Sequence, residues 1–182
     1  MGEVLSRDAL LGRIRRDRCD GRSIALANGC FDLLHVGHVR YLAAAAEQAD
    51  KLIVAVNDDP AVAALKGAGR PILRARDRAE LVAALRAVDY VVIFSEPTAA
   101  RLLETLRPDV HCKGTDYTVD TVPERDQARA LGVRSAIVGD PKEHSTRDLL
   151  RRVAERRPTA RGAISTAAER DREGRGSTTT DT

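Results

Sequence analysis

The sequence is short of aromatic residues, cysteines and long apolar runs. Phe, Trp and Tyr together make up 3% of its 182 residues, and Trp is absent. The three cysteines, Cys19, Cys30 and Cys112, are widely spaced and form no Cys-x-x-Cys pair. This spacing argues against a disulfide scaffold and predicts free thiols in a reduced, cytoplasmic protein. No apolar run approaches the ~20 residues of a membrane-spanning helix, so we expect no membrane association.

The chain also lacks a strong excess of charge and two common nucleotide-binding motifs. Its formal net charge is +3, which is too small to indicate a nucleic-acid partner. Neither the Gly-x-Gly-x-x-Gly dinucleotide fingerprint nor the Gly-x-x-x-x-Gly-Lys-Ser/Thr P-loop occurs. Their absence argues against an NAD-type enzyme and against a P-loop kinase.

The pattern of apolar residues predicts one α/β domain. Short apolar runs alternate with stretches of helical spacing, which is typical of a parallel sheet covered on both faces. Five strands are predicted, at residues 24–27, 51–56, 90–94, 110–112 and 133–138. We expect a helical extension at 1–22, the domain at 23–157 and a disordered tail at 158–182, where apolar residues are scarce. The first helix either packs on the domain or mediates a homodimer, and the sequence leaves both interpretations open.

The most informative stretch joins the first strand to the next helix. It reads Asn28-Gly29-Cys30-Phe31-Asp32-Leu33-Leu34-His35-Val36-Gly37-His38. His35 and His38 are about one helical turn apart, so both rings can face one ligand. A helix N-terminus offers unpaired N–H groups and a positive dipole end to an anion. Gly29 and Gly37 would let phosphate oxygens approach the backbone, and the stretch therefore predicts a phosphate-binding turn.

Two other interpretations of the histidine pair were weighed. His-x-x-His can hold a metal, but only His111, His144 and scattered cysteines remain as further ligands, and no metal ligand is predicted. The histidines could also simply cap or pack. Neither interpretation explains why two histidines and two glycines surround one turn that follows a strand.

Further polar residues are predicted near the same end of the sheet. The second strand ends in a predicted polar turn, Asn57-Asp58-Asp59-Pro60, and Lys113-Gly114-Thr115-Asp116 follows the fourth. Ligands of open α/β sheets gather at the carboxyl ends of the strands. Lys66-Gly67 lies in a predicted loop, and lysine is scarce, with four lysines against 26 arginines. A retained lysine suggests a site that needs a compact ammonium charge, although a solvent-facing lysine is the simpler alternative.

These residues resemble a known family. Gly29-Cys30-Phe31-Asp32-x-x-His35-x-Gly37-His38 resembles the HxGH signature of the cytidylyltransferase-like nucleotidyltransferases. Three further blocks are similar to the heptose 1-phosphate adenylyltransferase branch, although Thr115 stands where many relatives have glycine. The blocks are Lys66-Gly67 with Arg70-Pro71, Pro108-Asp109 to Asp116-Tyr117, and Ser145-Thr146.

The resemblance implies a Rossmann-like, doubly wound parallel five-stranded sheet and a specific reaction. AMP would pass from ATP, with Mg²⁺, to a sugar 1-phosphate, D-glycero-D-manno-heptose 1-phosphate, giving ADP-heptose and pyrophosphate. A separate sugar kinase would supply the substrate, because the chain carries no kinase domain. The resemblance assigns catalysis to His35, His38 and Lys66. It assigns nucleotide binding to Asn28, Gly29, Cys30, Phe31, Gly37, Arg78, Ser145 and Thr146, and sugar-phosphate binding to Asp32, Asn57, Lys113 and Asp116.

Three alternatives remain at this stage. A cytidylyltransferase would use CTP with glycerol 3-phosphate or a related small phosphate, and the HxGH element alone does not distinguish it. A non-catalytic nucleotide-binding regulator would release no pyrophosphate, but the intact histidine pair and Lys66 argue against it. A redox domain of similar topology is disfavoured by the missing glycine fingerprint.

Overall fold

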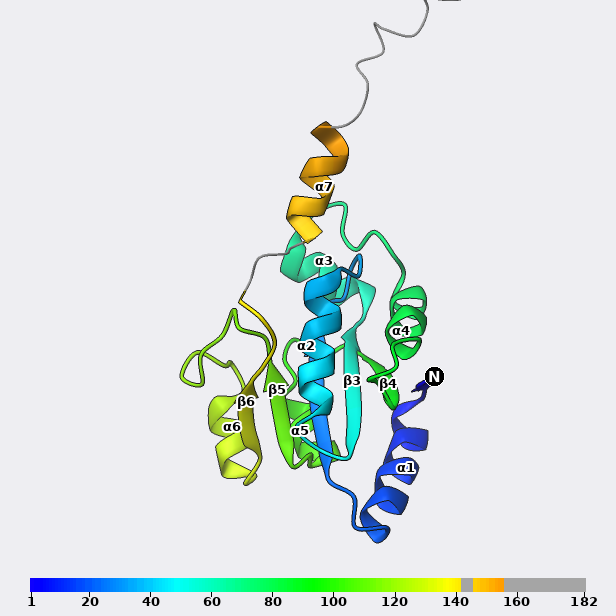
Figure 1. The fold of residues 1–182 in the computed structure, drawn as a ribbon, viewed down its shortest axis with the longest axis vertical. Coiled ribbons are helices and arrows are strands. Elements are labelled where there is room, and N and C mark those ends of the chain that lie inside the picture. The colour runs from blue at the N-terminus through cyan, green and yellow to red at the C-terminus, as the bar shows by residue number, and fades with distance from the viewer. Residues whose placement is uncertain (142–145, 156–182) are drawn as a thin grey trace, which may run out of the picture. The chain divides into compact units, whose positions relative to one another are not determined.

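The computed structural model describes residues 1–141 and 146–155 (Figure 1). Ser145 and the predicted tail at 158–182 therefore lie outside the described residues. The chain divides into two compact units, Met1–Thr146 and Arg147–Thr182. The sheet and every site contact described below belong to the first unit. Within the described residues, no helix is both long and apolar enough to cross a membrane.

The first unit is built on a parallel sheet of six strands in the order β1-β4-β3-β2-β5-β6. The strands are β1 (Glu3–Val4), β2 (Ile24–Gly29), β3 (Lys51–Asn57), β4 (Tyr90–Phe94), β5 (Val110–Lys113) and β6 (Arg134–Ile137). The predicted parallel α/β class is confirmed, but the expected number of five strands is wrong. Glu3 and Val4 pair with Tyr90 and Val91 and add a sixth strand at one edge. Two residues are too short to show any alternating pattern in the sequence.

Helices cover both faces of the sheet, as a doubly wound fold requires. The covering helices are α1 (Arg7–Cys19), α2 (Val36–Ala46), α4 (Ala75–Ala83), α5 (Ala100–Leu106) and α6 (Arg125–Ala130). The chain also forms α3 (Asp59–Lys66) and, at the start of the second unit, α7 (Thr146–Glu155). One apolar core joins the sheet to α2 and α4, and a second joins it to α1, α5 and α6. Successive side chains of a strand point to opposite faces of the sheet. In β3, Val54 therefore lies in the first core and Ile53 in the second. In Figure 1, α2 runs in front of the sheet.

The helix α3 was not predicted. The sequence predicts a polar turn at Asn57–Pro60 and a loop around Lys66. In the structure, the Asp58 side chain accepts a hydrogen bond from the Ala61 N–H at 2.8 Å and caps a helix with Pro60 in its first turn. Both are standard helix-start signals. The helix ends at Gly67, whose φ of 91° favours glycine, so Lys66 is the last residue of a helix.

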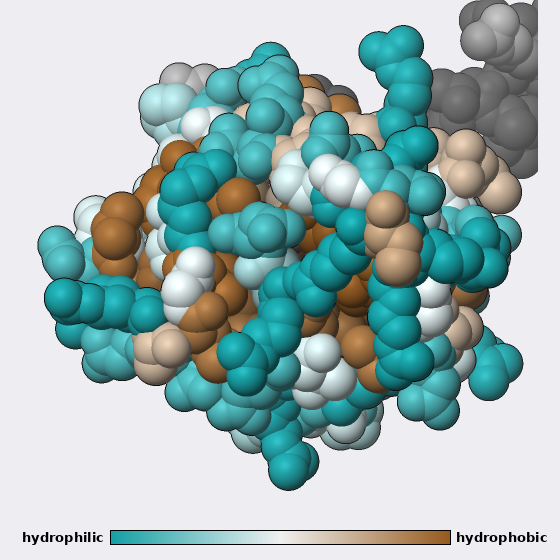
Figure 2. All heavy atoms as spheres, turned by 90° about the horizontal axis from the view of Figure 1, so that it is seen from below, coloured by the Kyte–Doolittle hydropathy of each residue, from teal (hydrophilic) through white to brown (hydrophobic). Residues whose placement is uncertain are grey.

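The order of the strands decides which polar turns meet. From β2 the chain moves outward to β3 and β4, and it then returns to place β5 on the other side of β2. Ligands of open α/β sheets bind outside the carboxyl ends of the strands at such a reversal. Here those ends are Gly29 of β2 and Lys113 of β5. Figure 2 shows the molecule from the opposite end, where hydrophilic side chains cover most of the face and hydrophobic ones show between them.

Candidate active site

The histidine pair lies at the N-terminus of α2. His35 is the N-cap residue and His38 lies in the first turn, and their rings stack with centroids 3.8 Å apart. The edge of the Phe31 ring supports His38, with centroids 5.3 Å apart. The predicted juxtaposition of the two rings is therefore confirmed, and the pair can present nitrogen atoms to one ligand.

His38 is held as a neutral imidazole. Burial, together with His35 and the positive charge of Lys66, lowers its pKa to about 4. Its Nδ1 atom is buried and has no hydrogen-bond partner among the described residues. A buried nitrogen of this kind is costly unless a ligand or water satisfies it. The Lys66 charge acts on His38 from an exposed side chain at the end of α3.

The N-terminus of α2 lacks a side-chain cap among the described residues. His35 makes no side-chain capping hydrogen bond, and no acidic residue occurs in the first turn. By contrast, the first turns of α1 and α3 are capped by Ser6 and Asp58. Uncapped N–H groups and the helix dipole both favour bound negative charge.

The turn between β2 and α2 has an unusual backbone. Phe31 and Leu33 adopt left-handed conformations, with φ of 48° and 61°, which residues with a Cβ rarely adopt and which cluster at functional sites. Gly29 does not provide this conformation. A Cβ at Gly29 would lie 3.2 Å from the Phe31 ring, so this glycine makes room for the aromatic ring. The predicted close approach of phosphate to Gly29 and Gly37 stays a prediction.

Asp32 ties this turn to the loop that precedes α4. Its buried carboxylate pairs with Arg70, with Oδ2 and Nη2 2.7 Å apart. Its other oxygen accepts hydrogen bonds from the backbone N–H groups of Ile72 and Leu73, at 3.0 and 3.3 Å. The Asp32 carbonyl accepts a hydrogen bond from Thr146 Oγ1 at 2.8 Å. The expected contact of Asp32 with the sugar phosphate stays a prediction, and in the structure its carboxylate binds the loop.

Arg78 is fully buried and joins three segments. Its Nε donates to the Leu73 carbonyl at 3.0 Å, its Nη1 to the Cys30 carbonyl at 2.5 Å and its Nη2 to Asp59 at 2.7 Å. All three nitrogens therefore bind protein groups. The predicted contact of Arg78 with nucleotide remains a prediction, and the contacts seen here hold the HxGH turn against α3.

The β5 side of the site contains a buried polar network. His111 is fully buried, and its Nε2 lies 3.1 Å from Asn28 Oδ1, which links β5 to β2. Two residues further along β5, Lys113 Nζ forms a 3.0 Å ion pair with Glu124. Glu124 also accepts a hydrogen bond from the Ala99 N–H at 2.9 Å. Asn28 and Lys113 thus lie near the carboxyl ends of β2 and β5, as predicted. Each contacts a residue that was not among the predicted site residues, His111 and Glu124 respectively.

The remaining candidates surround these groups. Asn57 is buried at the end of β3, with its Oδ1 4.0 Å from Cys30 Sγ. Asp116 is exposed on the turn after β5. The Tyr117 ring on that turn lies 5.3 Å from Lys113 Nζ. The geometry thus gathers the predicted residues from β2, β3 and β5 at one end of the sheet, apart from Ser145, which the structure does not describe.

The acidic residues Asp32 and Asp59 of this region form ion pairs with arginines. Within residues 1–141 and 146–155, no three His, Cys, Asp or Glu side chains form a group that could hold a metal ion. The carboxylates of Asp32 and Asp59 are engaged by arginines. Of the two further histidines considered for a zinc site, His111 binds Asn28, and His144 lies outside the described residues.

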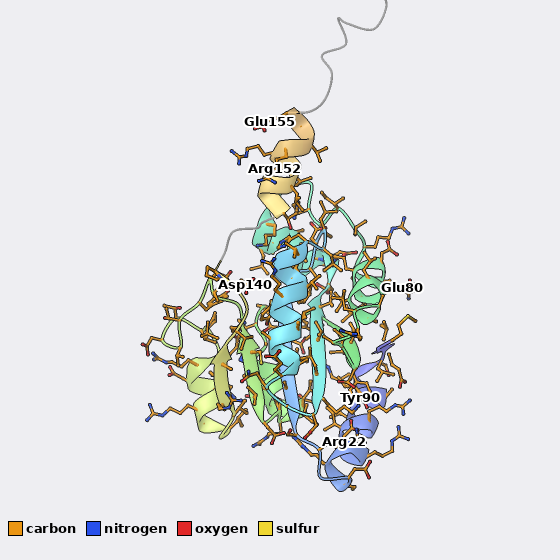
Figure 3. All side chains as sticks on the ribbon, viewed as in Figure 1. Arg22, Glu80, Tyr90, Asp140, Arg152 and Glu155 are labelled. Atoms are coloured by element: carbon orange, nitrogen blue, oxygen red, sulfur yellow. The ribbon has the colours of Figure 1, made fainter. Side chains whose placement is uncertain are left out.

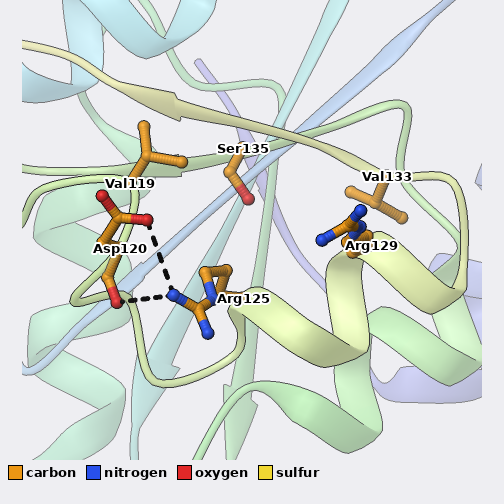
Figure 4. A pocket seen from close by; sticks show the side chains of 6 residues that line it. All are labelled: Val119, Asp120, Arg125, Arg129, Val133 and Ser135. Carbon is orange, nitrogen blue, oxygen red and sulfur yellow. Dashed lines mark hydrogen bonds and ion pairs between the residues drawn. The ribbon is translucent and has the colours of Figure 1, made fainter.

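A surface hollow lies elsewhere, beside the edge strand β6 (Figure 4). In it, Arg125 pairs with Asp120, with Nη1 and Oδ1 3.5 Å apart. Its lining residues are Val119, Asp120, Arg125, Arg129, Val133 and Ser135. None of them is a predicted site residue, and we place the chemistry at the HxGH turn, where the uncapped helix and the histidine pair coincide.

The buried histidine His111 predicts a loss of stability in acid. Burial and the Lys113 charge lower its pKa to about 4, while Glu124 acts in the opposite direction. Because the unfolded pKa is higher, near 6.5, the unfolded chain binds more protons between these values. The contribution of His111 is therefore complete above about pH 6.5 and is lost as the pH falls toward 4. We expect the free energy of unfolding to fall by on the order of 1–3 kcal/mol across this range.

Urea unfolding at several pH values measures this effect. His38 has a lowered pKa in the same range, so the His38→Gln variant serves as a background from which the contribution of His38 has been removed. Adding His111→Gln to that background should make the free energy of unfolding depend less steeply on pH between about 4 and 6.5. An unchanged slope in the double variant would contradict the role of His111.

Sequence reasoning missed three residues of this region because their partners are distant. Arg70 has no assigned role in its family block, Glu124 is not among the predicted site residues, and His111 is considered only as a further metal ligand. They contact Asp32, Lys113 and Asn28 respectively. The only available signal was the polar or charged side chain itself, because such a residue is rarely buried without a partner.

Comparisons with known proteins agree with this geometry. The family model for cytidylyltransferase-like proteins matches residues 26–172. The chain is 42% identical over 152 residues to the bifunctional protein HldE of Methylobacillus flagellatus, covering 84% of this chain and 31% of that protein. It is 46% identical over 150 residues to HldE of Ectopseudomonas mendocina, covering 82% of this chain and 32% of that protein. The chain therefore spans about a third of the length of these relatives.

A solved structure is also similar. The crystal structure of the lipopolysaccharide core biosynthesis protein from Thermoplasma volcanium GSS1 superposes with a TM-score of 0.58 at 27% sequence identity. The match covers 67% of this chain and the whole of that chain.

Proposed function

Because the chain belongs to the cytidylyltransferase-like family and is a nucleotidyltransferase, we propose that it transfers AMP from ATP to a sugar 1-phosphate. The proposed acceptor is D-glycero-D-manno-heptose 1-phosphate, and the products are ADP-heptose and pyrophosphate. The similarity to HldE proteins at 42% and 46% identity supports this branch of the family.

The proposed reaction needs alignment and charge stabilisation more than proton transfer. An oxygen of the sugar phosphate attacks the α-phosphorus of ATP, and the bond from that phosphorus to the bridging oxygen of the β-phosphate breaks. The electron pair leaves on pyrophosphate. A phosphate monoester is largely dianionic at neutral pH, so the nucleophile needs no general base. The protein therefore has to align two anions and stabilise the charge that develops on the leaving group.

The observation that carries the proposal is the N-terminus of α2. Among the described residues the His35 N-cap makes no side-chain capping hydrogen bond, the stacked rings of His35 and His38 lie at its first turn, and the Lys66 charge helps to lower the pKa of His38. A neutral His38 can donate a hydrogen bond without first losing or gaining a proton. Backbone N–H groups, imidazole N–H and an ammonium group are together suited to a triphosphate.

Mg²⁺ is proposed to enter the site with ATP. Since Asp32 and Asp59 are engaged by Arg70 and Arg78, phosphate oxygens and water would hold the ion, which is its usual mode with nucleotides. When bound, it would neutralise part of the triphosphate charge. We also propose that a sugar kinase supplies the sugar 1-phosphate.

A substrate screen tests the proposed function. The purified chain with Mg²⁺ is offered ATP, CTP, GTP or UTP together with heptose 1-phosphate, glucose 1-phosphate or glycerol 3-phosphate, and released pyrophosphate is measured. We expect ATP with heptose 1-phosphate to exceed every other pair by about tenfold or more in kcat/KM, which corresponds to ~1.4 kcal/mol. Equal or faster turnover with CTP and glycerol 3-phosphate would place the chain in the cytidylyltransferase branch. Nucleotide binding without pyrophosphate release from any pair would favour a regulator.

A further inference from the structure

The segment that carries Lys66 is tied to the HxGH turn on both sides. Before Lys66, Asp59 at the start of α3 pairs with Arg78, and Arg78 also donates to the Cys30 carbonyl. After Lys66, the chain reaches Arg70, which pairs with Asp32. Cys30 and Asp32 belong to the turn that leads into the histidine helix. Both tethers therefore end on the same short turn.

The Asp32–Arg70 pair is the stronger candidate for a positioning role. The Asp32 side chain is 2% exposed and that of Arg70 is 17% exposed, so water screens the pair little. The same carboxylate also binds two backbone N–H groups of the loop. Only Gly67, Ala68 and Gly69 separate Lys66 from Arg70. The two glycines have positive φ, and without an anchor such a connection would let the end of α3 move.

We propose that Arg70 is a positioning residue that, through Asp32, holds Lys66 beside the histidine pair. The chemistry assigned to Lys66 rests on the proposed function, whereas the positioning itself does not. Arg70 does not touch the substrate in this proposal. It acts by keeping the ammonium group where the phosphate groups of a nucleotide would meet it.

The proximity of Lys66 to His38 supplies a readout that needs no substrate. The pKa of His38 is lowered by burial, by His35 and by Lys66, and Arg70 is not among the causes. Removing Lys66 should therefore raise the pKa of His38. Removing Arg70 should raise it only if Lys66 leaves its place. NMR titration of the His38 ring on the full chain measures both effects.

The test compares Arg70→Ala, Asp32→Asn and Lys66→Ala with a matched control. Arg76→Ala is the control, because Arg76 is exposed on the neighbouring first turn of α4 and makes no hydrogen bond or ion pair within the described residues. We expect Arg70→Ala and Asp32→Asn to raise the pKa of His38 by the amount seen in Lys66→Ala, and Arg76→Ala to leave it unchanged. In Arg70→Lys, the pKa of His38 should rise by less than in Arg70→Ala, because lysine retains the positive charge but not the planar guanidinium.

Kinetics provide the second measurement. Misplacing a catalytic group by about 1 Å can cost ~10²-fold in rate, so Arg70→Ala should lower kcat by about 10- to 100-fold while KM for ATP changes less. An unchanged pKa of His38 in both Arg70→Ala and Asp32→Asn overturns the proposal, even if kcat falls. If no substrate pair gives turnover, the proposed function fails, and the titration still decides whether Arg70 positions Lys66. Melting temperatures identify a variant that has lost its fold, and the other member of the pair then carries the test.

Discussion

Replacing His38 by alanine is expected to lower kcat by about 10²–10³-fold while changing the KM for ATP much less. The reason is that a donor aimed at the departing pyrophosphate becomes more effective as charge develops in the transition state. Its stacking on His35 and the contact with the edge of the Phe31 ring indicate that the His38 ring is held in place before a ligand arrives. Steady-state kinetics with ATP and the preferred sugar phosphate measure the effect.

Variants of neighbouring positions separate this prediction from its alternatives. His35→Ala should behave like His38→Ala, and the double variant should lose less than the product of the two factors, because the rings lie 3.8 Å apart and act on one group. Val39→Ala is the control, since Val39 is exposed on the same helix. A capping role predicts near-normal kcat with about 1 kcal/mol lower stability, and a zinc role predicts sensitivity to chelators. Normal turnover in His38→Ala would refute the catalytic role.

Replacing Glu124 by alanine is expected to destabilise the protein by about 3–5 kcal/mol, because it leaves the Lys113 charge buried without its partner. The two side chains are only 7% and 3% exposed, and their charged atoms are 3.0 Å apart. The variant also leaves the Ala99 N–H without its acceptor. Urea unfolding at pH 7 measures the change in the free energy of unfolding.

Two further variants give this second prediction its controls. Glu80→Ala should change stability by less than about 0.5 kcal/mol, because Glu80 is exposed on α4 (Figure 3). The double variant Lys113→Met with Glu124→Leu should recover much of the loss, since no charge is then buried. A change in Glu124→Ala as small as that in Glu80→Ala would show that the buried pair contributes little.

Much of this architecture is encoded locally. Each strand of the core carries a run of apolar residues such as those around Val54, and each neighbouring helix carries an apolar face. Both patterns repeat over several residues and can be recognised without tertiary contacts. The HxGH turn was predictable for the same reason, because His35 and His38 are three residues apart on one helix and must lie on one side of it.

Two other features are too short to give a periodic signal. The edge strand β1 is two residues long, and its pairing with β4 joins residues that are almost ninety positions apart in the sequence. The helix α3 did have a local signal in Asp58 and Pro60, but it was taken for a turn, and Lys66 was placed in a loop as a result. Short elements of this kind contain too few residues for a periodic pattern to be distinguished from a turn.

By itself, the sequence determined the α/β class, the position of the HxGH turn and most of the residues that gather at the carboxyl ends of the strands. Only the tertiary structure decided how these residues are used. Asp32 meets Arg70, Asn28 meets His111 and Lys113 meets Glu124, although the members of each pair come from different elements. The physical reason is that burial makes a charge or a polar atom costly unless it finds a partner. Which partner it finds depends on the order of the strands and the path of the loops, and no local pattern records that order.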